Sequence, residues 1–259
     1  MRKSLIKSAI CPLLKKMSVG MVLVFLLCSC STTDLGNVLD SGSDLFSAAI
    51  LTEDDVIAEA QEAAAEMDRL NEVAPENNKY GKRLARLCKG LENYDGLKLN
   101  FKVYLVTDIN AFAMPDGSVR VFSSLMDILE DDELMAIIGH EIGHVKFKHS
   151  YDQMRMSMIS HSTMSLLGQT GGYTGVVVDS ELGQMANRFI NAQYSQSDEL
   201  ESDAFSVPFL RQQGLDPSAS VGAIQALQNE FGDSNHFMSS HPSNPKRIVA
   251  LKEVIAAER

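Results

Sequence analysis

The sequence lacks a hydrophobic run that could remain in a membrane as a spanning helix. Its apolar run near the N-terminus, Met17 to Leu27, is eleven residues long, whereas a stable transmembrane helix needs roughly 18 to 20 residues. Five basic residues precede this run, and the run itself carries no charge. A basic segment followed by a short apolar run is typical of a signal peptide. We therefore expect residues 1–29 to direct export and then to be removed.

Cysteine is scarce, with four residues in 259. The segment Leu27-Cys28-Ser29-Cys30 resembles the lipobox of bacterial lipoproteins, in which a leucine and two small residues precede the cysteine that is acylated. Cys30 would then be the lipidated N-terminus, and Cys88 would remain as a lone, buried structural thiol. This arrangement excludes an intramolecular disulfide. The alternative is a plain signal peptide with two incidental cysteines.

Basic residues are also few. Removal of residues 1–29 leaves 18 basic and 34 acidic residues, a formal net charge of −16. Such a surface argues against nucleic acid as a partner and against electrostatic attraction to anionic lipid, so that the lipid at Cys30 must anchor the protein to the membrane. Ser31 follows Cys30, and enterobacterial lipoproteins that stay in the inner membrane tend to carry aspartate there. We expect an outer-membrane lipoprotein on the periplasmic face of a Gram-negative envelope, with an outer-membrane protein as a possible partner.

The composition changes near residue 51. Residues 30–51 are rich in Ser, Thr, Gly and Asp, as in a flexible tether. Residues 52–259 are numerous and apolar enough to form a single domain. Thr52, with Asp55 three residues later, predicts the start of a long helix.

The domain has few strand signals and many helix signals. Alternating apolar residues predict a half-buried strand over residues 97–106, and two apolar segments around Pro115-Asp116-Gly117 predict a β-hairpin. Helical periodicity predicts the following elements: helices starting near Ser124 and after Glu130, helices over residues 151–167, 176–194, 197–213 and 218–231, and a last helix from Pro245. The fold class is therefore α+β, mostly α, with a small β-sheet.

The helix after Glu130 carries the motif His140-Glu141-Ile142-Gly143-His144, and we expect its last turn to hold Lys146, Lys148 and His149. Residues four apart lie on one helix face, so His140 and His144 can offer two imidazoles to one ion. Glu141 can then act as the base toward a water molecule at the metal. Zn²⁺ suits imidazole ligands and commonly has three protein ligands at catalytic sites. The alternative is a helix that carries two histidines and binds no metal.

A third ligand is available in the acidic segment of residues 197–203. Glu199 and Asp203 are four residues apart and share a helix face, whereas Glu201 points away from both. One of the pair could bind the metal while the other orients a ligand. The spacing does not decide which, and a solvated charged face is the alternative.

The combined motifs resemble those of the M48 family of zinc metallopeptidases, in particular its soluble periplasmic lipoproteins. The resemblance covers about residues 80–250 and rests on these segments: Asn110 to Pro115 with the hairpin after it, His140 to His149, Glu199 to Asp203, and Ser239 to Pro242 followed by Arg247. It implies a zincin-like fold with the active-site helix beside the small sheet. The family has alanine where this chain has Ser202, a change between small residues.

The resemblance also implies the roles of the residues. His140, His144 and Glu199 would bind one Zn²⁺, Glu141 would be the general base, and Asp203 would orient a ligand. The strand at Asn110, Ala111 and Phe112 would pair with an extended substrate. His149 is interpreted as structural.

His241 has two interpretations. It could cap or pack against the last helix, or it could approach the metal as a catalytic residue, either donating to the oxyanion or filling the open coordination position.

These features predict a zinc endopeptidase that hydrolyses unfolded or misfolded envelope proteins. Two alternatives remain open: a chaperone-like or adaptor lipoprotein with a latent zinc site, and a purely structural zinc site.

Overall fold

The computed structural model describes residues 51–166, 181–231, 240–241 and 245–257. All of them belong to one compact unit, residues 44–259. The signal peptide, Cys30, the tether and the glycine-rich segment of residues 168–175 lie outside the described residues. Among the helices that are described, none combines the length and the apolarity needed to cross a membrane.

A three-stranded sheet in the order β3-β5-β4 forms the β part of the fold, with β3 at Asn100–Tyr104, β4 at Ala111–Ala113 and β5 at Ser118–Phe122. β4 and β5 pair antiparallel and β3 pairs parallel to β5, so the predicted hairpin is confirmed. Gly117 has a φ of 86° in the turn, and a Cβ there would lie 1.9 Å from the Lys98 carbonyl oxygen. Only glycine permits this close approach of the turn to the backbone at Lys98.

The prediction of one strand over residues 97–106 is wrong in its extent. Residues Leu97–Lys98 form β2, which pairs with β1 at Asn93–Tyr94, and the chain then continues as β3. The division follows from a change of hydrogen-bond partner. The Leu99 amide donates to the Glu92 carbonyl, whereas the Asn100 amide donates to the Gly117 carbonyl in the turn of the hairpin. The sheet pairing therefore interrupts a pattern that is continuous in the sequence.

Helix α3, Glu53–Leu70, begins with the predicted capping box, in which the Asp55 amide donates to the Thr52 side chain at 3.2 Å. Its buried face packs against Tyr104 and Phe112 of the sheet. Asp68 near its end accepts from Arg120, Lys102 and Tyr104 at 2.6 to 3.0 Å. Because Arg120 lies inside the sheet and is 2% exposed, these contacts tie α3 to the strands.

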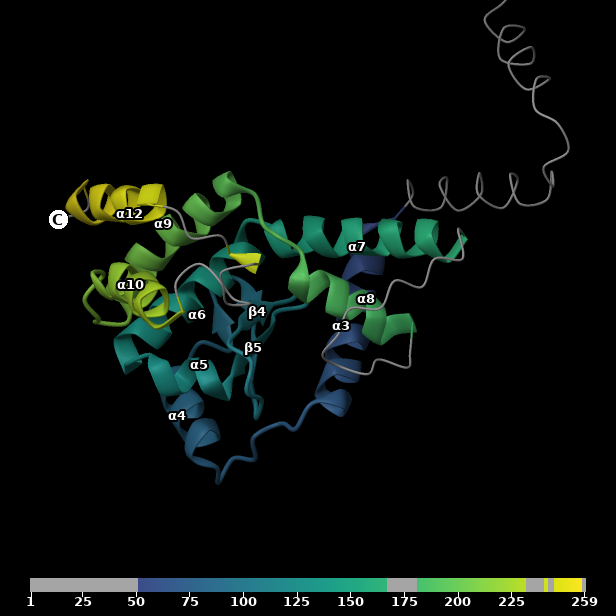
Figure 1. Ribbon diagram of the computed structural model, residues 1–259, viewed down its shortest axis with the longest axis horizontal. Helices are drawn as coiled ribbons and strands as arrows, with labels where there is room; N and C mark the ends of the chain where they lie inside the picture. Colours follow the sequence, from purple (N-terminus) through teal and green to yellow (C-terminus); the bar gives the residue numbers. More distant parts are fainter. Residues whose placement is uncertain (1–50, 167–180, 232–239, 242–244, 258–259) are drawn as a thin grey trace, which may run out of the picture. The chain divides into compact units, whose positions relative to one another are not determined.

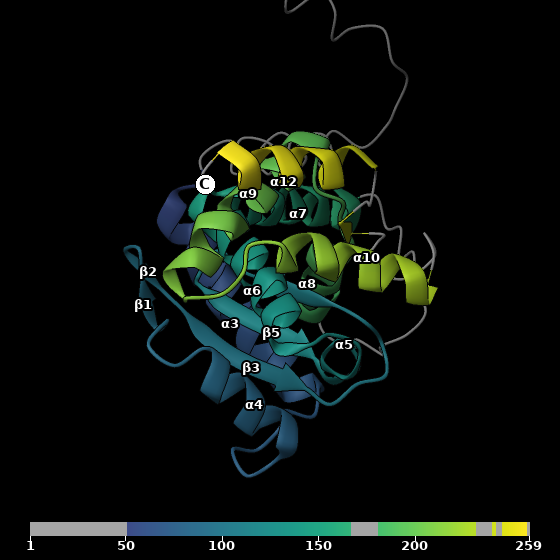
Figure 2. The same ribbon diagram turned by 90° about the vertical axis from the view of Figure 1, so that its left-hand side faces the viewer.

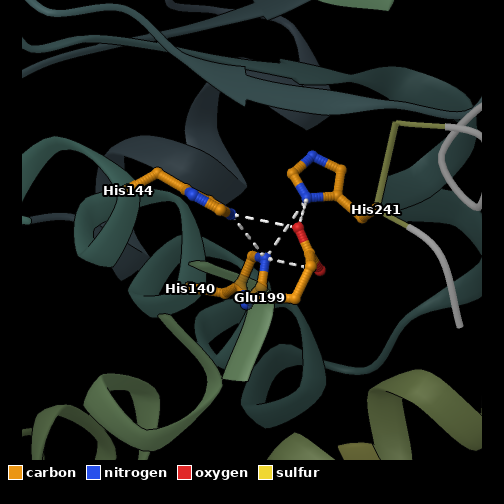
Figure 3. Close-up of side chains that lie close together, drawn as sticks. All are labelled: His140, His144, Glu199 and His241. Atoms are coloured by element: carbon orange, nitrogen blue, oxygen red, sulfur yellow. Dashed lines mark hydrogen bonds and ion pairs between the residues drawn. The ribbon is translucent and has the colours of Figure 1, made fainter. Parts of the chain in front are cut away.

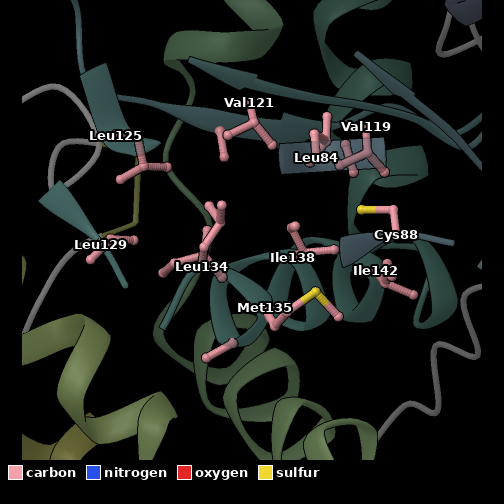
Figure 4. Packing of buried hydrophobic residues seen from close by; sticks show 14 of the residues in the cluster. Leu84, Cys88, Val119, Val121, Leu125, Leu129, Leu134, Met135, Ile138 and Ile142 are labelled. Carbon is pink, nitrogen blue, oxygen red and sulfur yellow. The ribbon is translucent and has the colours of Figure 1, made fainter. Parts of the chain in front are cut away.

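Two helices follow the hairpin in the chain and pack against its strands. Helix α5, Ser123–Ile128, has Phe122 at its N-cap and no side-chain cap, so the predicted start at Ser124 is one residue late. Helix α6, Asp131–Lys146, starts at a capping box between Glu130 and Glu133. Figure 4 shows leucine and isoleucine side chains of α6 packed toward β5 and toward α4, Lys79–Leu87. Every residue of α6 from Leu134 to Val145 is buried.

The end of α6 differs from the prediction. Lys148 has a φ of 65°, a left-handed conformation that ends the helix, and His149 starts the next helix instead of closing this one. That helix, α7, spans His149–Leu166. The thiol of Cys88 is buried as predicted, and burial raises its pKa to about 12.

The remaining helices are α8, Glu181–Asn191, α9, Gln196–Gln212, α10, Ala219–Phe231, and α12, Pro245–Ala257. All four were predicted, although the described part of α8 is shorter than residues 176–194. α9 packs closely on α6, and α12 lies along α9 in both views (Figures 1 and 2). The α+β, mostly helical fold class is confirmed.

Candidate active site

The two histidines of α6 face the same point. Their Nε2 atoms lie 3.0 Å apart, and both imidazoles are buried. Helix α9 brings Glu199 to them, with its Oε1 3.4 Å from His144 Nε2 and its Oε2 3.6 Å from His140 Nε2. The close packing of α6 on α9 allows this approach, since a Cβ at Gly143 would lie only 3.0 Å from the Ser202 Cα.

His241, just before α12, completes the cluster. Its Nδ1 lies 3.0 Å from Glu199 Oε1 and 3.3 Å from His140 Nε2. Figure 3 shows the four side chains converging, and one ligand atom from each lies within 4.8 Å of all the others. His241 therefore lies among the candidate metal ligands and does not cap a helix. This position favours the interpretation of His241 as a residue at the metal.

The chemistry and spacing of the four groups fit a zinc ion. Zinc bonds of about 2.0 to 2.1 Å in a tetrahedron would separate the ligand atoms by about 3.3 Å. The five separations above range from 3.0 to 3.6 Å, with Glu199 facing His140 through Oε2 and facing His144 and His241 through Oε1. The pair of His144 and His241 has ligand atoms within 4.8 Å of each other. Burial lowers the pKa of His144 well below its usual value, which keeps its imidazole in the neutral form that binds metals.

Each α6 histidine has a second contact on its Nδ1 side. His140 Nδ1 lies 2.9 Å from Asp203 Oδ1, the position expected for an orienting carboxylate. His144 Nδ1 lies 3.2 Å from His149 Nδ1. His149 Nε2 in turn lies 3.3 Å from the exposed Glu201. Glu201 therefore points away from the cluster as predicted, but it reaches His144 indirectly.

Arg247 of α12 joins the two carboxylates of α9. It donates to both oxygens of Asp203 at 2.7 Å and forms an ion pair with Glu199 Oε2 at 2.6 Å. Burial alone would raise the pKa of Glu199, but His241, His140 and Arg247 outweigh it and hold that pKa well below its usual range. The sequence motif included Arg247, yet spacing gave it no role.

Glu141 is completely buried, and neither of its carboxylate oxygens forms a hydrogen bond with a described residue. Its Oε1 lies 3.5 Å from His241 Nε2. Burial raises its pKa, against the opposing effect of His241 and His140. A buried carboxylate with unused acceptor capacity is suited to accept a proton.

Tyr194 is a site residue that sequence reasoning missed. Its ring stacks on the His144 ring, with centroids 3.7 Å apart, and its amide donates to the Ser240 carbonyl at 3.2 Å. It therefore contacts both the motif helix and the segment that carries His241. A lone tyrosine in a loop offers no spacing signal that could have identified it.

The expected substrate strand lies at an edge. Among the described strands, β4 pairs with β5 alone. The side chains of Asn110, Ala111 and Phe112 are buried, and Phe112 packs against Tyr104 and Phe122. Ala111 and Ala113 are at most 1% exposed as whole residues, so the backbone at this edge is covered as well.

Comparison with known proteins agrees with this geometry. A model of peptidase family M48 matches residues 76–255. The chain belongs to this family. It is 37% identical over 237 residues to the metalloprotease YcaL of Escherichia coli strain K12, covering 90% of this chain and 93% of that protein. It is 33% identical over 247 residues to the metalloprotease LoiP of the same organism, covering 95% and 98%.

A more distant relative is the beta-barrel assembly-enhancing protease of Yersinia pestis, 27% identical over 183 residues, covering 64% of this chain and 34% of that protein. As a member of family M48 with named metalloproteases aligned along most of its length, the chain is a zinc metallopeptidase. Its cluster of three histidines and one glutamate is the group in the described residues that could hold the metal.

Proposed function

We propose that the chain is an endopeptidase that binds one Zn²⁺ through His140, His144 and Glu199. The observation that carries this proposal is the convergence of these residues, from two helices, at the separations of a tetrahedral site. A bound zinc would polarise the scissile carbonyl and lower the pKa of a water molecule to about 7. Asp203 and Arg247 hold the histidine and the glutamate in place from outside the cluster.

Glu141 is the proposed general base. It lies in the turn that carries the two histidines, and its free oxygens can take a proton from the attacking water and return it to the leaving amine. His241 lies between Glu141 and Glu199. In this position it can donate to the oxyanion of the reaction, or it can hold the fourth ligand position until a substrate displaces it.

The proposed substrate is an extended polypeptide that adds a strand to β4. Hydrogen bonds from Phe122 to the Asn110 carbonyl and from Met114 to the Ser118 carbonyl fix the ladder between β4 and β5. Since bonding alternates along an antiparallel strand, the backbone groups of Ala113 and the carbonyl of Ala111 point away from β5. Both residues are buried, so a substrate strand would have to displace what covers them. Pairing there would use backbone and not side chains, which favours unfolded substrates.

We further propose that the protein acts in a bacterial envelope, as an outer-membrane lipoprotein anchored through Cys30 and facing the periplasm. The lipobox-like segment supports the anchor, and the relative named as a beta-barrel assembly-enhancing protease supports a role in the quality control of envelope proteins. Labelling with a palmitate analogue tests the anchor. A Cys30→Ala variant that still incorporates the label would contradict it.

The decisive experiment uses the full chain purified in detergent. Glu141→Gln should retain one zinc per chain by mass spectrometry and lose cleavage of unfolded casein, while the parent loses cleavage with a chelator and regains it with Zn²⁺. Equal cleavage by the variant would refute the role of Glu141. Peptides N-methylated at alternate backbone positions test the strand, because only one alternating set should resist cleavage.

The burial of all four cluster residues favours a second candidate, a client-binding protein whose site is latent. His140, His144, Glu199 and His241 are each at most 3% exposed. If zinc is bound and unfolded protein is retained without cleavage by both the parent and a His241→Ala variant, this candidate replaces the endopeptidase. Cleavage that appears or increases in the variant would instead show that His241 restrains a working enzyme.

A further inference from the structure

A pocket of about 490 Å³ lies beside the metal cluster, between α7, α8 and the start of α9. Figure 1 shows α7 and α8 close together. The volume is within the range of pockets that hold small ligands or a few side chains. No role for this pocket follows from the motif or from the metal site.

Two side chains separate the pocket from the metal ligands. His149 lines the pocket and contacts His144 Nδ1 at 3.2 Å. Tyr194 also lines it and stacks on the His144 ring. The pocket is therefore separated from His144 of the cluster by the thickness of one side chain.

Arg188 lines the pocket and has unused hydrogen-bonding capacity. Its Nη1 is buried and has no hydrogen-bond partner, and the guanidinium takes part in none of the ion pairs among the described residues. Buried donors in proteins are nearly always paired, so an unpaired guanidinium nitrogen in a pocket wall calls for an acceptor in the pocket, either water or a group of a ligand. Arginine is also the side chain best suited to bind a carboxylate through two parallel hydrogen bonds.

Two acidic residues line the same pocket, but neither supplies that acceptor. Asp152 is exposed to solvent, which screens its charge. Asp198 accepts from the Ser195 amide at 3.1 Å in the capping box of α9, and it lies 3.8 Å from His149 Nε2. Their charges weaken the attraction of this pocket for an anion, whereas the buried Nη1 of Arg188 favours an anion.

We propose that this pocket is a specificity subsite that binds a carboxylate of the polypeptide substrate through Arg188. The inference rests on the proposed endopeptidase function and adds to it a preference for an acidic side chain near the scissile bond. The free carboxylate at the end of a substrate chain offers the same chemistry. The experiment below distinguishes the two sources.

Cleavage sites are first mapped in unfolded casein by mass spectrometry with the full, zinc-loaded chain. Peptides spanning one site are then made with Glu or Gln at each of the three positions on either side, and with a free or an amidated C-terminus. A charge-assisted hydrogen bond contributes roughly 1.5 to 3 kcal/mol. We expect Glu to exceed Gln in kcat/KM by roughly 10- to 150-fold at one position, the fold-change that corresponds to this range.

Arg188→Gln should abolish that ratio without changing zinc content or thermal stability, and Arg188→Glu should favour Lys at the same position. Arg155→Gln is the matched control, since Arg155 is a partly buried arginine of α7 that does not line the pocket. If amidation removes the preference instead, and Arg188→Gln abolishes the effect of amidation, the pocket binds the chain end. A Glu to Gln ratio that is the same in the parent and in Arg188→Gln, with no effect of amidation, overturns the proposal.

A second readout needs no turnover. Calorimetry measures the affinity of the Glu and Gln peptides for the zinc-loaded Glu141→Gln variant. The Glu peptide should bind more tightly by the same factor, and addition of Arg188→Gln should remove this difference in affinity. If the parent never cleaves but this ratio is present, the endopeptidase function fails and the subsite stands. If the parent cleaves and the ratio is absent from both assays, the subsite alone fails.

Discussion

The contact between His144 and His149 predicts that His149 strengthens zinc binding without being a ligand. When His144 Nε2 faces the metal, the proton of its ring is on Nδ1 and points to His149 Nδ1, 3.2 Å away. His149 must then accept at Nδ1 and donate from Nε2, and Glu201 lies 3.3 Å from that nitrogen. The two contacts together fix the tautomer and the ring orientation of the ligand.

The size of the effect follows from burial. His149 is 9% exposed, so water cannot easily replace the lost acceptor in a His149→Phe variant. Loss of such a partner lowers metal affinity by about 10- to 100-fold, which corresponds to about 1.4 to 2.7 kcal/mol. Glu201 has a side chain that is 54% exposed, and Glu201→Gln should therefore change the affinity far less.

The assay is competition for Zn²⁺ against a chromophoric chelator at neutral pH, with thermal melts of the metal-free variants to separate ligation from folding. His149→Gln should restore part of the affinity, because its amide can accept from one neighbour and donate to the other. The reasoning is refuted if His149→Phe holds zinc as tightly as the parent while His144→Ala releases it. If His144→Ala also keeps its zinc, the ligand assignment itself is wrong.

Three further changes have outcomes that the packing and the charges determine. Gly139→Ala places a Cβ 2.4 Å from the Phe209 ring, so we expect a loss of about 1 to 3 kcal/mol in the free energy of unfolding, measured by urea denaturation; unchanged stability would show that the ring moves aside freely. Arg247→Met leaves two buried carboxylates without their cation and should cost about 3 to 5 kcal/mol in the metal-free protein, with a smaller loss once zinc is bound; equal losses would contradict the charge argument. Burial raises the pKa of Asp68, but hydrogen bonds from its three donors outweigh this and hold the pKa below its ordinary value. The stabilisation by Asp68 is therefore complete above about pH 4, its pKa in the unfolded chain, and is lost as the pH falls through the folded pKa. In a plot of the free energy of unfolding against pH, Asp68→Asn should therefore reduce the slope on the acid side. An unchanged slope would exclude Asp68 as its source.

The parts of the fold that depend on near neighbours in sequence could be predicted. The capping pair Thr52 and Asp55 lies within one turn, and the turn at Gly117 lies between two short apolar segments. The division of the strand over residues 97–106 could not be predicted, because it depends on contacts with segments outside that strand. The end of α6 was missed because Lys148 adopts a left-handed conformation that lysine rarely favours.

The site shows the same dependence on distance. The four-residue spacing of His140 and His144 predicted two imidazoles on one face, which the structure confirms. Glu199 and Asp203 have that spacing as well, and the sequence alone left their roles open. The structure separates them, since Asp203 contacts the Nδ1 side of His140 and Glu199 lies on the Nε2 side. Tyr194 reaches the cluster only through tertiary packing.

The contact of Arg247 with both carboxylates of α9 has a consequence for biosynthesis. Helix α12 follows both α6 and α9 in the chain, so these two helices are made before the guanidinium that balances the charges of α9. A polypeptide without α12 carries the histidine motif of α6 but lacks the guanidinium that contacts Glu199 and Asp203. Assembly of the complete cluster therefore requires α12 to be docked on α9.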